Sequence, residues 1–376
     1  MAESKVRVDV GGRTLTLSNL EKVLYPASGF TKGEVIDYYV QVAEPVIEHV
    51  KDRPATRKRW PDGVGAEFFF EKNAPRGTPG WVRTVLIEHG EGVRYVVVDS
   101  LPTLAWVANL AALELHVPQW TVGPRDAVRD SDLLVFDLDP GPPATIVECC
   151  RVAELLRARL ADDGLEAWPK TSGNKGAQLY VPLSRPVSGA RASEYAKRLA
   201  AELSHGHPDL VVATMAKNAR PGKVYIDWSQ NNAAKTTVAP YSLRGTDRPQ
   251  VSTPLMWDEV ADAGRAEDLV FTPADVVGRL EDYGDLLAPM RSTRQTLPAQ
   301  RPPESHPSRR DCTNGPGEPT TTDPPPGPFV QSRRERGARN PSPTGTRLPT
   351  QPGHNRRIRG DLLTPMRSTR QTLPAQ

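Results

Sequence analysis

Asp137 and Asp139 follow the apolar run Leu133–Phe136 and are separated by Leu138 alone. The run, with the Pro-Gly pair that comes after it, predicts a buried strand that ends in a turn. Because side chains alternate along a strand, both carboxylates are expected on one face, starting about 7 Å apart. Two converging carboxylates suit hard cations such as Mg²⁺ or Mn²⁺, which commonly serve phosphoryl transfer.

Two other interpretations fit this short acidic pattern. The pair can simply close an ordinary strand and face water, since such motifs are common. Haloacid-dehalogenase phosphatases also carry an apolar strand followed by D-x-D-x-T or D-x-D-x-V. Here the last position is Gly141, which lacks the defining side chain, so the choice depends on the rest of the chain.

Asp227 offers a third carboxylate, at the end of a second predicted strand, Lys223–Trp228. It alternates with Ile226, so it can face the side on which the first two acids lie. Three such groups would suffice for two metal ions that bridge the attacking and leaving oxygens of an in-line displacement. Taken alone, Asp227 is more simply read as an exposed strand acid.

The segment Ser172–Gly176 (SGNKG) lies between two predicted strands, Glu166–Lys170 and Ala177–Leu183. Its glycines would let backbone N–H groups approach an anion, while Ser172 and Lys175 add a hydroxyl and an ammonium. It is not a Walker loop, which needs GxxxxGK[ST] before a helix. A plain hairpin turn is the alternative.

Further cations stand at Arg57–Arg59 and Arg244, where arginine could hold phosphates in a bidentate manner. Such basic runs more commonly form a solvated loop. His116 ends a predicted buried helix, Pro102–His116, where a structural or capping histidine is the usual case. The strand-like pair Phe69 and Phe70 reads as core, although one ring must point outward and could stack on a base.

Helices and strands alternate along the first part of the chain. Capping boxes at Thr31-x-x-Glu34 and Thr145-x-x-Glu148 each predict the start of a helix, and Pro45 should split the first one. A further helix is expected at about Ala192–Leu203. Strands alternating with helices in this way favour an α/β or α+β fold with mixed sheets.

Charge divides the chain into two parts. Residues 291–376 hold 15 Arg, no Lys and six acids, a net +9, whereas residues 1–290 hold 33 basic and 39 acidic residues, a net −6. The tail is rich in Pro, Gly, Ser, Thr and Arg and contains no tryptophan, so it cannot bury enough apolar surface to fold. We therefore predict a folded domain over residues 6–289 and a disordered tail over residues 290–376, dispensable for folding.

The tail holds a duplication, since residues 285–300 recur as residues 361–376 with one change, Ala288 to Thr364. A coding-sequence duplication explains it as well as any function. No run of about 18 apolar residues and no signal-peptide core occur, so we expect a soluble, cytoplasmic protein with no membrane partner. The three cysteines form neither a disulfide framework nor a CxxC metal pattern.

Nine stretches occur in a fixed order: LEKVLYP, TKGEVIDYY, RPATRKRWP, FFEK, LELHVPQW, LVFDLDPG, TSGNKG, KVYIDWSQN and KTTVAPYSLRG. Together they resemble the polymerase domain of bacterial ligase D, which belongs to the archaeo-eukaryotic primase superfamily and acts in non-homologous end joining. The resemblance covers about residues 6–287. Nine ordered motifs are far more specific than any single one.

The resemblance implies a primase-polymerase fold with a mixed-sheet core like that of RNA-recognition motifs. It implies two Mn²⁺ or Mg²⁺ ions on Asp137, Asp139 and Asp227. The triphosphate of an incoming NTP or dNTP would be held by Lys58, Arg59, His116, Ser172, Lys175 and Arg244, with Gln230 nearby.

By the same resemblance, Asn19, Lys22 and Lys32 would hold the 5′-phosphate at a DNA end or gap. Phe69 and Phe70 would meet the template. No K-x-D-G adenylation motif occurs in the chain, so sealing would need Ku and a separate ATP-dependent DNA ligase as partners, at the nucleoid.

We predict from these observations a template-dependent nucleotidyltransferase that fills or extends DNA ends during double-strand break repair. A non-catalytic factor that bridges DNA ends is the alternative. A metal-dependent phosphatase ranks third because of Gly141.

Overall fold

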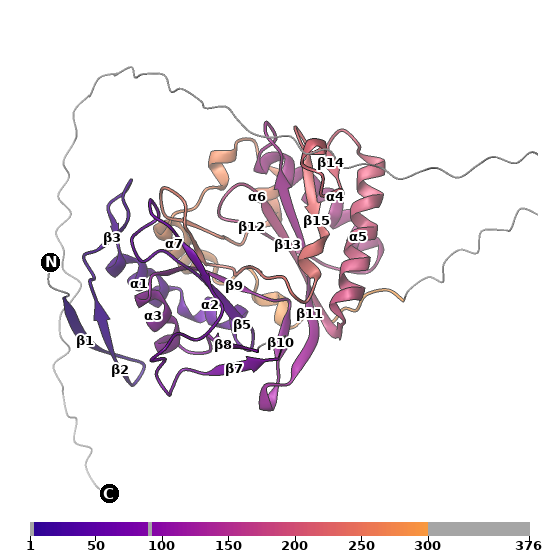
Figure 1. Cartoon of the computed structure of the whole chain (residues 1–376). Coiled ribbons are helices and arrows are strands. Elements are labelled where there is room, and N and C mark those ends of the chain that lie inside the picture. The colour runs from indigo at the N-terminus through magenta and orange to yellow at the C-terminus, as the bar shows by residue number, and fades with distance from the viewer. Residues whose placement is uncertain (1–3, 89–91, 300–376) are drawn as a thin grey trace, which may run out of the picture. The chain divides into compact units, whose positions relative to one another are not determined.

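The structure is a computed structural model, and it describes residues 4–88 and 92–299. In this part of the chain, two six-stranded sheets, the first mixed and the second antiparallel, carry most of the residues singled out above (Figure 1). Residues 300–376 of the predicted disordered tail, which include the second copy of the duplicated segment, lie outside the described residues. The class is the expected mixed α/β.

The first sheet is built around the long strand that holds Asp137 and Asp139. Its order is β12-β13-β11-β15-β14, with β10 also pairing with β11, and all its neighbours are antiparallel except β14 and β15. Its strands are β10 (Trp120–Val122), β11 (Val128–Pro140), β12 (Trp168–Thr171), β13 (Ala177–Val187), β14 (Val211–Val212) and β15 (Val224–Asp227).

Helices cover one face of this sheet. Leu134, Phe136 and Leu138 alternate along β11 and are fully buried, on the side where α4 (Ile146–Asp162) and α5 (Gly189–Gly206) pack. Figure 1 shows both helices beside β11, β13 and β15. The intervening residues of β11 must therefore point to the other face, which is the face that Asp137 and Asp139 occupy.

The second sheet has the order β16-β9-β5-β8-β7, with β6 pairing with the C-terminal half of β5. Helices α1 and α2 pack against α3, which in turn contacts β9. The strands are β5 (Pro54–Arg59), β6 (Phe69–Glu71), β7 (Thr84–Ile87), β8 (Val93–Val97), β9 (Ala112–Val117) and β16 (Thr237–Val238), and the helices are α1 (Lys32–Gln41), α2 (Ala43–Val50) and α3 (Leu101–Asn109).

The predicted helix over Pro102–His116 is wrong in its second half. Helix α3 ends at Asn109, and Ala111 takes a positive φ of 57°, a conformation that a helix does not allow. Leu113 and Leu115 are then buried in strand alternation, which places Glu114 and His116 together on the other side of β9. His116 is thus a strand residue and caps no helix.

Other local signals are confirmed. Both capping boxes form, at Thr31 and at Thr145, and the first helix divides at Val42. The remaining elements are β1 (Lys5–Val10), β2 (Arg13–Ser18), β3 (Val23–Tyr25), β4 (Phe30–Thr31), β17 (Leu243–Arg244), β18 (Gln250–Val251), α6 (Trp257–Ala261) and α7 (Pro273–Tyr283).

The folded part runs past the predicted boundary at residue 289. The side chain of Gln295 bonds the backbone N–H and C=O of Glu166 at 2.8 and 2.9 Å, and Leu297 is only 6% exposed. The backbone C=O of Gln295 accepts from Ser184 N–H at 2.9 Å. We call residues 285–299 the C-terminal strap, because they lie across the end of β13.

In the described ranges, no helix combines the length and the apolar character that crossing a membrane requires.

Candidate active site

The three predicted metal ligands meet at the end of β11. Asp137 lies directly opposite Asp227 in the antiparallel ladder of β11 and β15, and one carboxylate oxygen from each of Asp137, Asp139 and Asp227 lies within 4.8 Å of the others. Asp139 is exposed, while the other two are partly buried. The sequence-based expectation that these acids share one face is confirmed.

Two of these acids, Asp137 and Asp139, have raised pKa values. Burial and the charges of Asp139 and Asp227 raise the pKa of Asp137 to about 7, although a hydrogen bond from Gln178 opposes the rise. Burial and the Asp227 charge likewise raise the pKa of Asp139, against the lowering effect of Arg220. Three carboxylates at this spacing, two of them with raised pKa values, form a donor set that a hard divalent cation would stabilise.

Hydrogen bonds hold two of the acids in place. Gln178 Nε2 donates to Asp137 Oδ1 at 2.9 Å, and Asp227 accepts from Ser229 Oγ at 2.6 Å and from Gln230 Nε2 at 3.1 Å. Each acid keeps a second oxygen or a free lone pair for a cation. The residues present therefore fit the implied metal site.

A cavity of about 250 Å³ opens beside Asp137 and Asp139. It brings together most of the side chains that the resemblance assigned to a triphosphate. Its lining comprises His116, Asp137, Asp139, Ser172, Asn174, Lys175, Gly176, Gln178, Gln230, Thr236, Thr237, Val238 and Arg244.

The SGNKG segment forms the turn between β12 and β13, as expected, and packs against the strand that carries Arg244. Gly173 has a φ of 70°, and a Cβ there would meet Ser252 N at 2.6 Å and Arg244 Cγ at 2.7 Å. Only glycine fits this approach. The turn therefore sets the distance between Ser172, Lys175 and Arg244 around the cavity.

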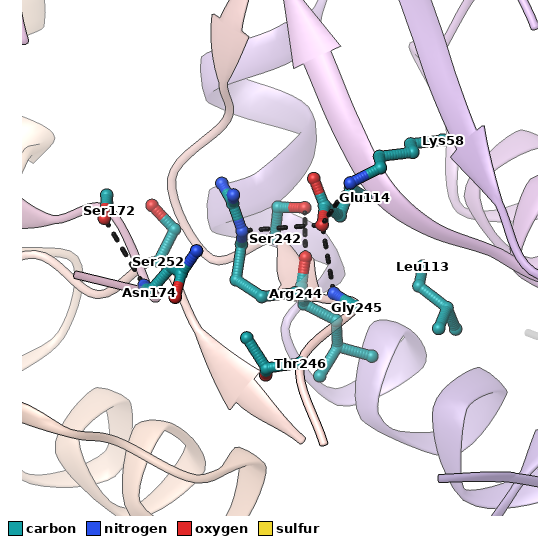
Figure 2. Close-up of polar contacts among 12 residues, drawn as sticks. Lys58, Leu113, Glu114, Ser172, Asn174, Ser242, Arg244, Gly245, Thr246 and Ser252 are labelled. Carbon is teal, nitrogen blue, oxygen red and sulfur yellow. Dashed lines mark hydrogen bonds and ion pairs between the residues drawn. The ribbon is translucent and has the colours of Figure 1, made fainter. Parts of the chain in front are cut away.

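Glu114 was not among the predicted site residues, yet it contacts three of them, of which Figure 2 shows Lys58 and Arg244. Its carboxylate accepts from His116 Nε2 at 2.7 Å and lies 3.6 Å from both Lys58 Nζ and Arg244 Nε. Burial tends to raise its pKa, but the hydrogen bond from His116 and the charge of Arg244 outweigh burial and lower the pKa to about 2. The alternation in LELHV was the sequence signal for it, and the mistaken helix concealed it.

Gln178 and Lys170 were also missed. They form, with Asp137 and Asp227, one row across four adjacent strands of the first sheet. Lys170 is fully buried, donates to Ser252 Oγ at 2.5 Å, and has its pKa lowered by burial and by Arg244. Single-strand patterns do not reveal which residues lie opposite one another, so no signal could have indicated this row.

Arg59 lies away from the cavity lining. Its Nη1 pairs with Glu71 at 2.9 Å and its Nε donates to Leu110 O at 2.7 Å. Phe69 and Phe70 on β6 are 43% and 58% exposed, so their interpretation as core is wrong and both rings are open to a partner. The ring of Phe70 lies 6.1 Å from that of His116, which connects this aromatic edge to the cavity.

Asn19, Lys22 and Lys32 form a separate group beside β3 and α1. Lys32 N–H donates to Lys22 O at 2.8 Å, and Lys22 N–H donates to Asn19 O at 3.0 Å. Lys22 Nζ pairs with Asp62 at 2.7 Å, whereas Lys32 is only 6% exposed and its Nζ donates to Ser18 O at 2.6 Å. The three residues are neighbours, but both ammonium groups already have partners.

The chain is similar in sequence to known proteins. The family model described as LigD, primase-polymerase domain, matches residues 31–287. The chain is 50% identical over 275 residues to the multifunctional non-homologous end joining protein LigD of Mycolicibacterium smegmatis, and 43% identical over 316 residues to that of Mycobacterium tuberculosis. These alignments cover 73% and 80% of this chain but only 36% and 41% of the relatives.

A solved structure is similar as well. The polymerase domain from Mycobacterium tuberculosis ligase D, in complex with DNA, matches with a TM-score of 0.71 and 44% sequence identity. The match covers 76% of this chain and 99% of that domain. The chain thus spans about two fifths of the length of its full-length relatives and nearly all of their polymerase domain.

Proposed function

The chain belongs to the LigD primase-polymerase domain family, and from this premise we propose that it is a template-dependent nucleotidyltransferase that fills or extends DNA ends during double-strand break repair by non-homologous end joining. One observation carries the proposal. Two of the three acids of a candidate metal site, Asp137 and Asp139, line the same 250 Å³ cavity that His116, Ser172, Lys175 and Arg244 line.

We propose that Asp137, Asp139 and Asp227 hold two divalent ions, Mn²⁺ or Mg²⁺, which when bound supply charge stabilisation at the reacting phosphate. The protein's own groups position the reactants. Lys175, Arg244, Ser172 and the SGNKG backbone orient the triphosphate, so that a primer 3′-hydroxyl can attack the α-phosphate in line. Catalysis by positioning and fixed charge is the usual mode of such transfer.

Lys58, His116 and Gln230 complete the proposed nucleotide site. Lys58 does not line the cavity, and its Nζ lies 4.0 Å from the ring centroid of Phe68 and 3.6 Å from Glu114. The exposed rings of Phe69 and Phe70 offer stacking surfaces for template bases. Arg59, which is paired with Glu71, would act on a phosphate only after exchanging that partner.

We further propose that Asn19, Lys22 and Lys32 bind the 5′-phosphate of a DNA gap. Lys32 occupies the first turn of α1, where the helix dipole favours an anion, although the N–H groups of Lys32, Gly33 and Glu34 already donate within the protein. Substituting both lysines by Ala should remove most of the preference for phosphorylated over unphosphorylated gapped DNA. Ku and a separate ATP-dependent ligase are the expected partners at the nucleoid.

Primer extension on gapped DNA, with Mn²⁺ and with rNTPs and dNTPs side by side, tests this function. Template-directed addition is the expected result. An intact chain that binds DNA ends and adds no nucleotide would instead be a bridging factor. Family membership leaves the phosphatase interpretation without support, because the D-x-D strand is explained by the polymerase fold.

A further inference from the structure

Glu114 is a buried carboxylate around which three elements converge. It lies directly opposite Lys58 in the ladder of β5 and β9, and it shares one side of β9 with His116, two residues along. Arg244 and Gly245 approach it from β17 and the residue after that strand. The Glu114 side chain is only 3% exposed, so these four partners replace water around it.

Two kinds of contact surround this carboxylate. His116 and the Gly245 N–H are hydrogen bonded to it, at 2.7 and 3.0 Å. Lys58 Nζ and Arg244 Nε both lie at 3.6 Å, beyond hydrogen-bond length, and Arg244 Nε has no hydrogen-bond partner within the described part of the chain. Figure 2 shows Arg244 between Glu114 and the SGNKG turn.

Gly245 packs closely against Trp60 where its N–H donates to Glu114. A Cβ on Gly245 would collide with the indole ring of Trp60, so only a glycine lets the chain come close enough to present its N–H to Glu114. The backbone after β17 is thus held at a fixed distance from β9. The backbone of Arg244, the preceding residue, is held in place by the same contact.

We propose that Glu114 is a positioning residue for nucleotide binding. It holds His116 and β17 by hydrogen bonds, and it attracts Lys58 and Arg244 without saturating them, so that both cations can turn to an incoming triphosphate. This inference rests on the proposed nucleotidyltransferase function. Without the Glu114 carboxylate, the side chains of Lys58, His116 and Arg244 would lose their common partner, and the two cations would repel each other and move apart.

The substitution Glu114→Gln distinguishes a positioning role from the direct effect of the Glu114 charge on nucleotide binding. The variant removes a negative charge close to an anion site, so charge alone would make nucleotide binding tighter. Loss of positioning predicts the opposite: a nucleotide KM raised about tenfold or more, with kcat within about threefold of the parent, because the acids at the metal site are untouched. In an Arg244→Ala background the same substitution should have a smaller effect on KM, since it acts through Arg244.

Asp285→Asn is the matched control. Asp285 also accepts from a histidine, His49 at 3.0 Å, and from a backbone N–H, Leu287 at 3.0 Å, and it pairs with Arg291 at 3.4 Å. It does not line the cavity. A purely structural role for Glu114 would lower the stability of both variants and leave the nucleotide KM of both unchanged.

The experiment measures primer extension with Mn²⁺ across nucleotide concentrations for the parent and both variants, with thermal unfolding recorded for each. A raised KM in Glu114→Gln alone supports the inference, whereas an unchanged or lower KM overturns it. If Glu114→Gln does not fold, Glu114→Asp keeps the charge but withdraws it by about one carbon–carbon bond. Its KM must then rise, and parental KM would overturn the inference.

Failure of the proposed function would look different. In that case the parent itself adds no nucleotide, and the inference is tested by equilibrium binding of a fluorescent nucleoside triphosphate. The expected loss of affinity in Glu114→Gln is again about tenfold, and equal affinity of parent and variant overturns it.

Discussion

Two sets of acids lie on the two six-stranded sheets of this protein and have opposite properties: Asp137, Asp139 and Asp227 on the first, and Glu114 on the second. On β11 and β15, Asp137 is surrounded by other carboxylates, and its pKa rises to about 7. On β9, Glu114 is surrounded by His116, Arg244 and Lys58, and its pKa falls to about 2. Burial raises the pKa of both, so the neighbours decide the direction of each shift.

The two sets differ in the source of the positive charge that balances them. The acids of the first sheet repel one another and would be stabilised by an added cation, whereas the carboxylate of the second sheet already has its cations within the protein. The same kind of residue therefore serves as a metal ligand in one place and, as we propose, as a positioning group in the other.

The largest effect is expected from the acids of the first sheet. Asp137→Ala or Asp139→Ala should reduce nucleotide addition at least about 1000-fold, because a metal ion contributes several kcal/mol of transition-state stabilisation. Binding to a 5′-phosphorylated gap should stay nearly intact, since the lost charges are negative. Substantial primer extension by either variant would place the metal site elsewhere.

The cations that line the cavity should give a smaller and different effect. Lys175→Ala and Arg244→Ala are expected to weaken nucleotide binding by about 1.5–3 kcal/mol each, or roughly 10- to 150-fold, since each loses a charge-assisted contact. Single-turnover kinetics over a range of nucleotide concentrations measures this affinity. Unchanged affinity in both variants would remove them from the triphosphate site.

The C-terminal strap carries another paired acid, Asp285, and lies away from the cavity lining. We therefore expect the strap to contribute to stability alone. Truncation after residue 289 removes Arg291, the buried Leu297 and the bonds of Gln295 to Glu166. Denaturant unfolding should show a loss of about 3–6 kcal/mol, from lost apolar burial and from backbone groups left unpaired. Truncation after residue 299 should cost little, and equal stability of the two truncated proteins would contradict this assignment.

The pH dependence of stability should distinguish the two acid sets most finely. The folded pKa of Asp137 is above its ordinary value of 3.8, so the metal-free folded state binds the extra proton, and stability falls as pH rises from about 4 to 7. The folded pKa of Glu114 is below its ordinary 4.5, so its contribution is present above pH 4.5 and lost as pH falls toward 2.

Thermal unfolding between pH 5 and 8 without metal measures this contrast. Asp137→Asn should melt a few degrees higher than the parent at pH 8, with the difference shrinking toward pH 5. Glu114→Gln should melt lower than the parent by a nearly constant amount across this range. A pH-independent difference for Asp137→Asn would mean that its pKa is not raised.

Much of the fold and site could be predicted from short-range patterns. Capping boxes at Thr31 and Thr145 marked their helices, and period-2 alternation placed Asp137, Asp139 and Asp227 on one face. These signals are local, because caps and alternation depend only on neighbouring residues. The resemblance to a known family then indicated that the SGNKG turn and Arg244 belong to one site, and both line the cavity.

Features that depend on strand pairing were not predictable in this way. The opposition of Gln178 to Asp137, and of Glu114 to Lys58, follows from register, which a single strand does not encode. The strand β9 was mistaken for helix because a positive φ at Ala111 is not marked by glycine. Residues 290–299 of the strap were assigned to the tail because their polar composition conceals the few residues that pack.

Binding of Mn²⁺ to the intact chain tests the central contrast most directly. Titration of the protein with Mn²⁺, with free ion measured by electron paramagnetic resonance, should show binding in the parent, loss of at least tenfold in affinity in Asp139→Asn, and parental affinity in Glu114→Gln. Asp139 is exposed, so its variant should fold. If Asp139→Asn binds Mn²⁺ as tightly as the parent, the acids of the first sheet are not the metal site.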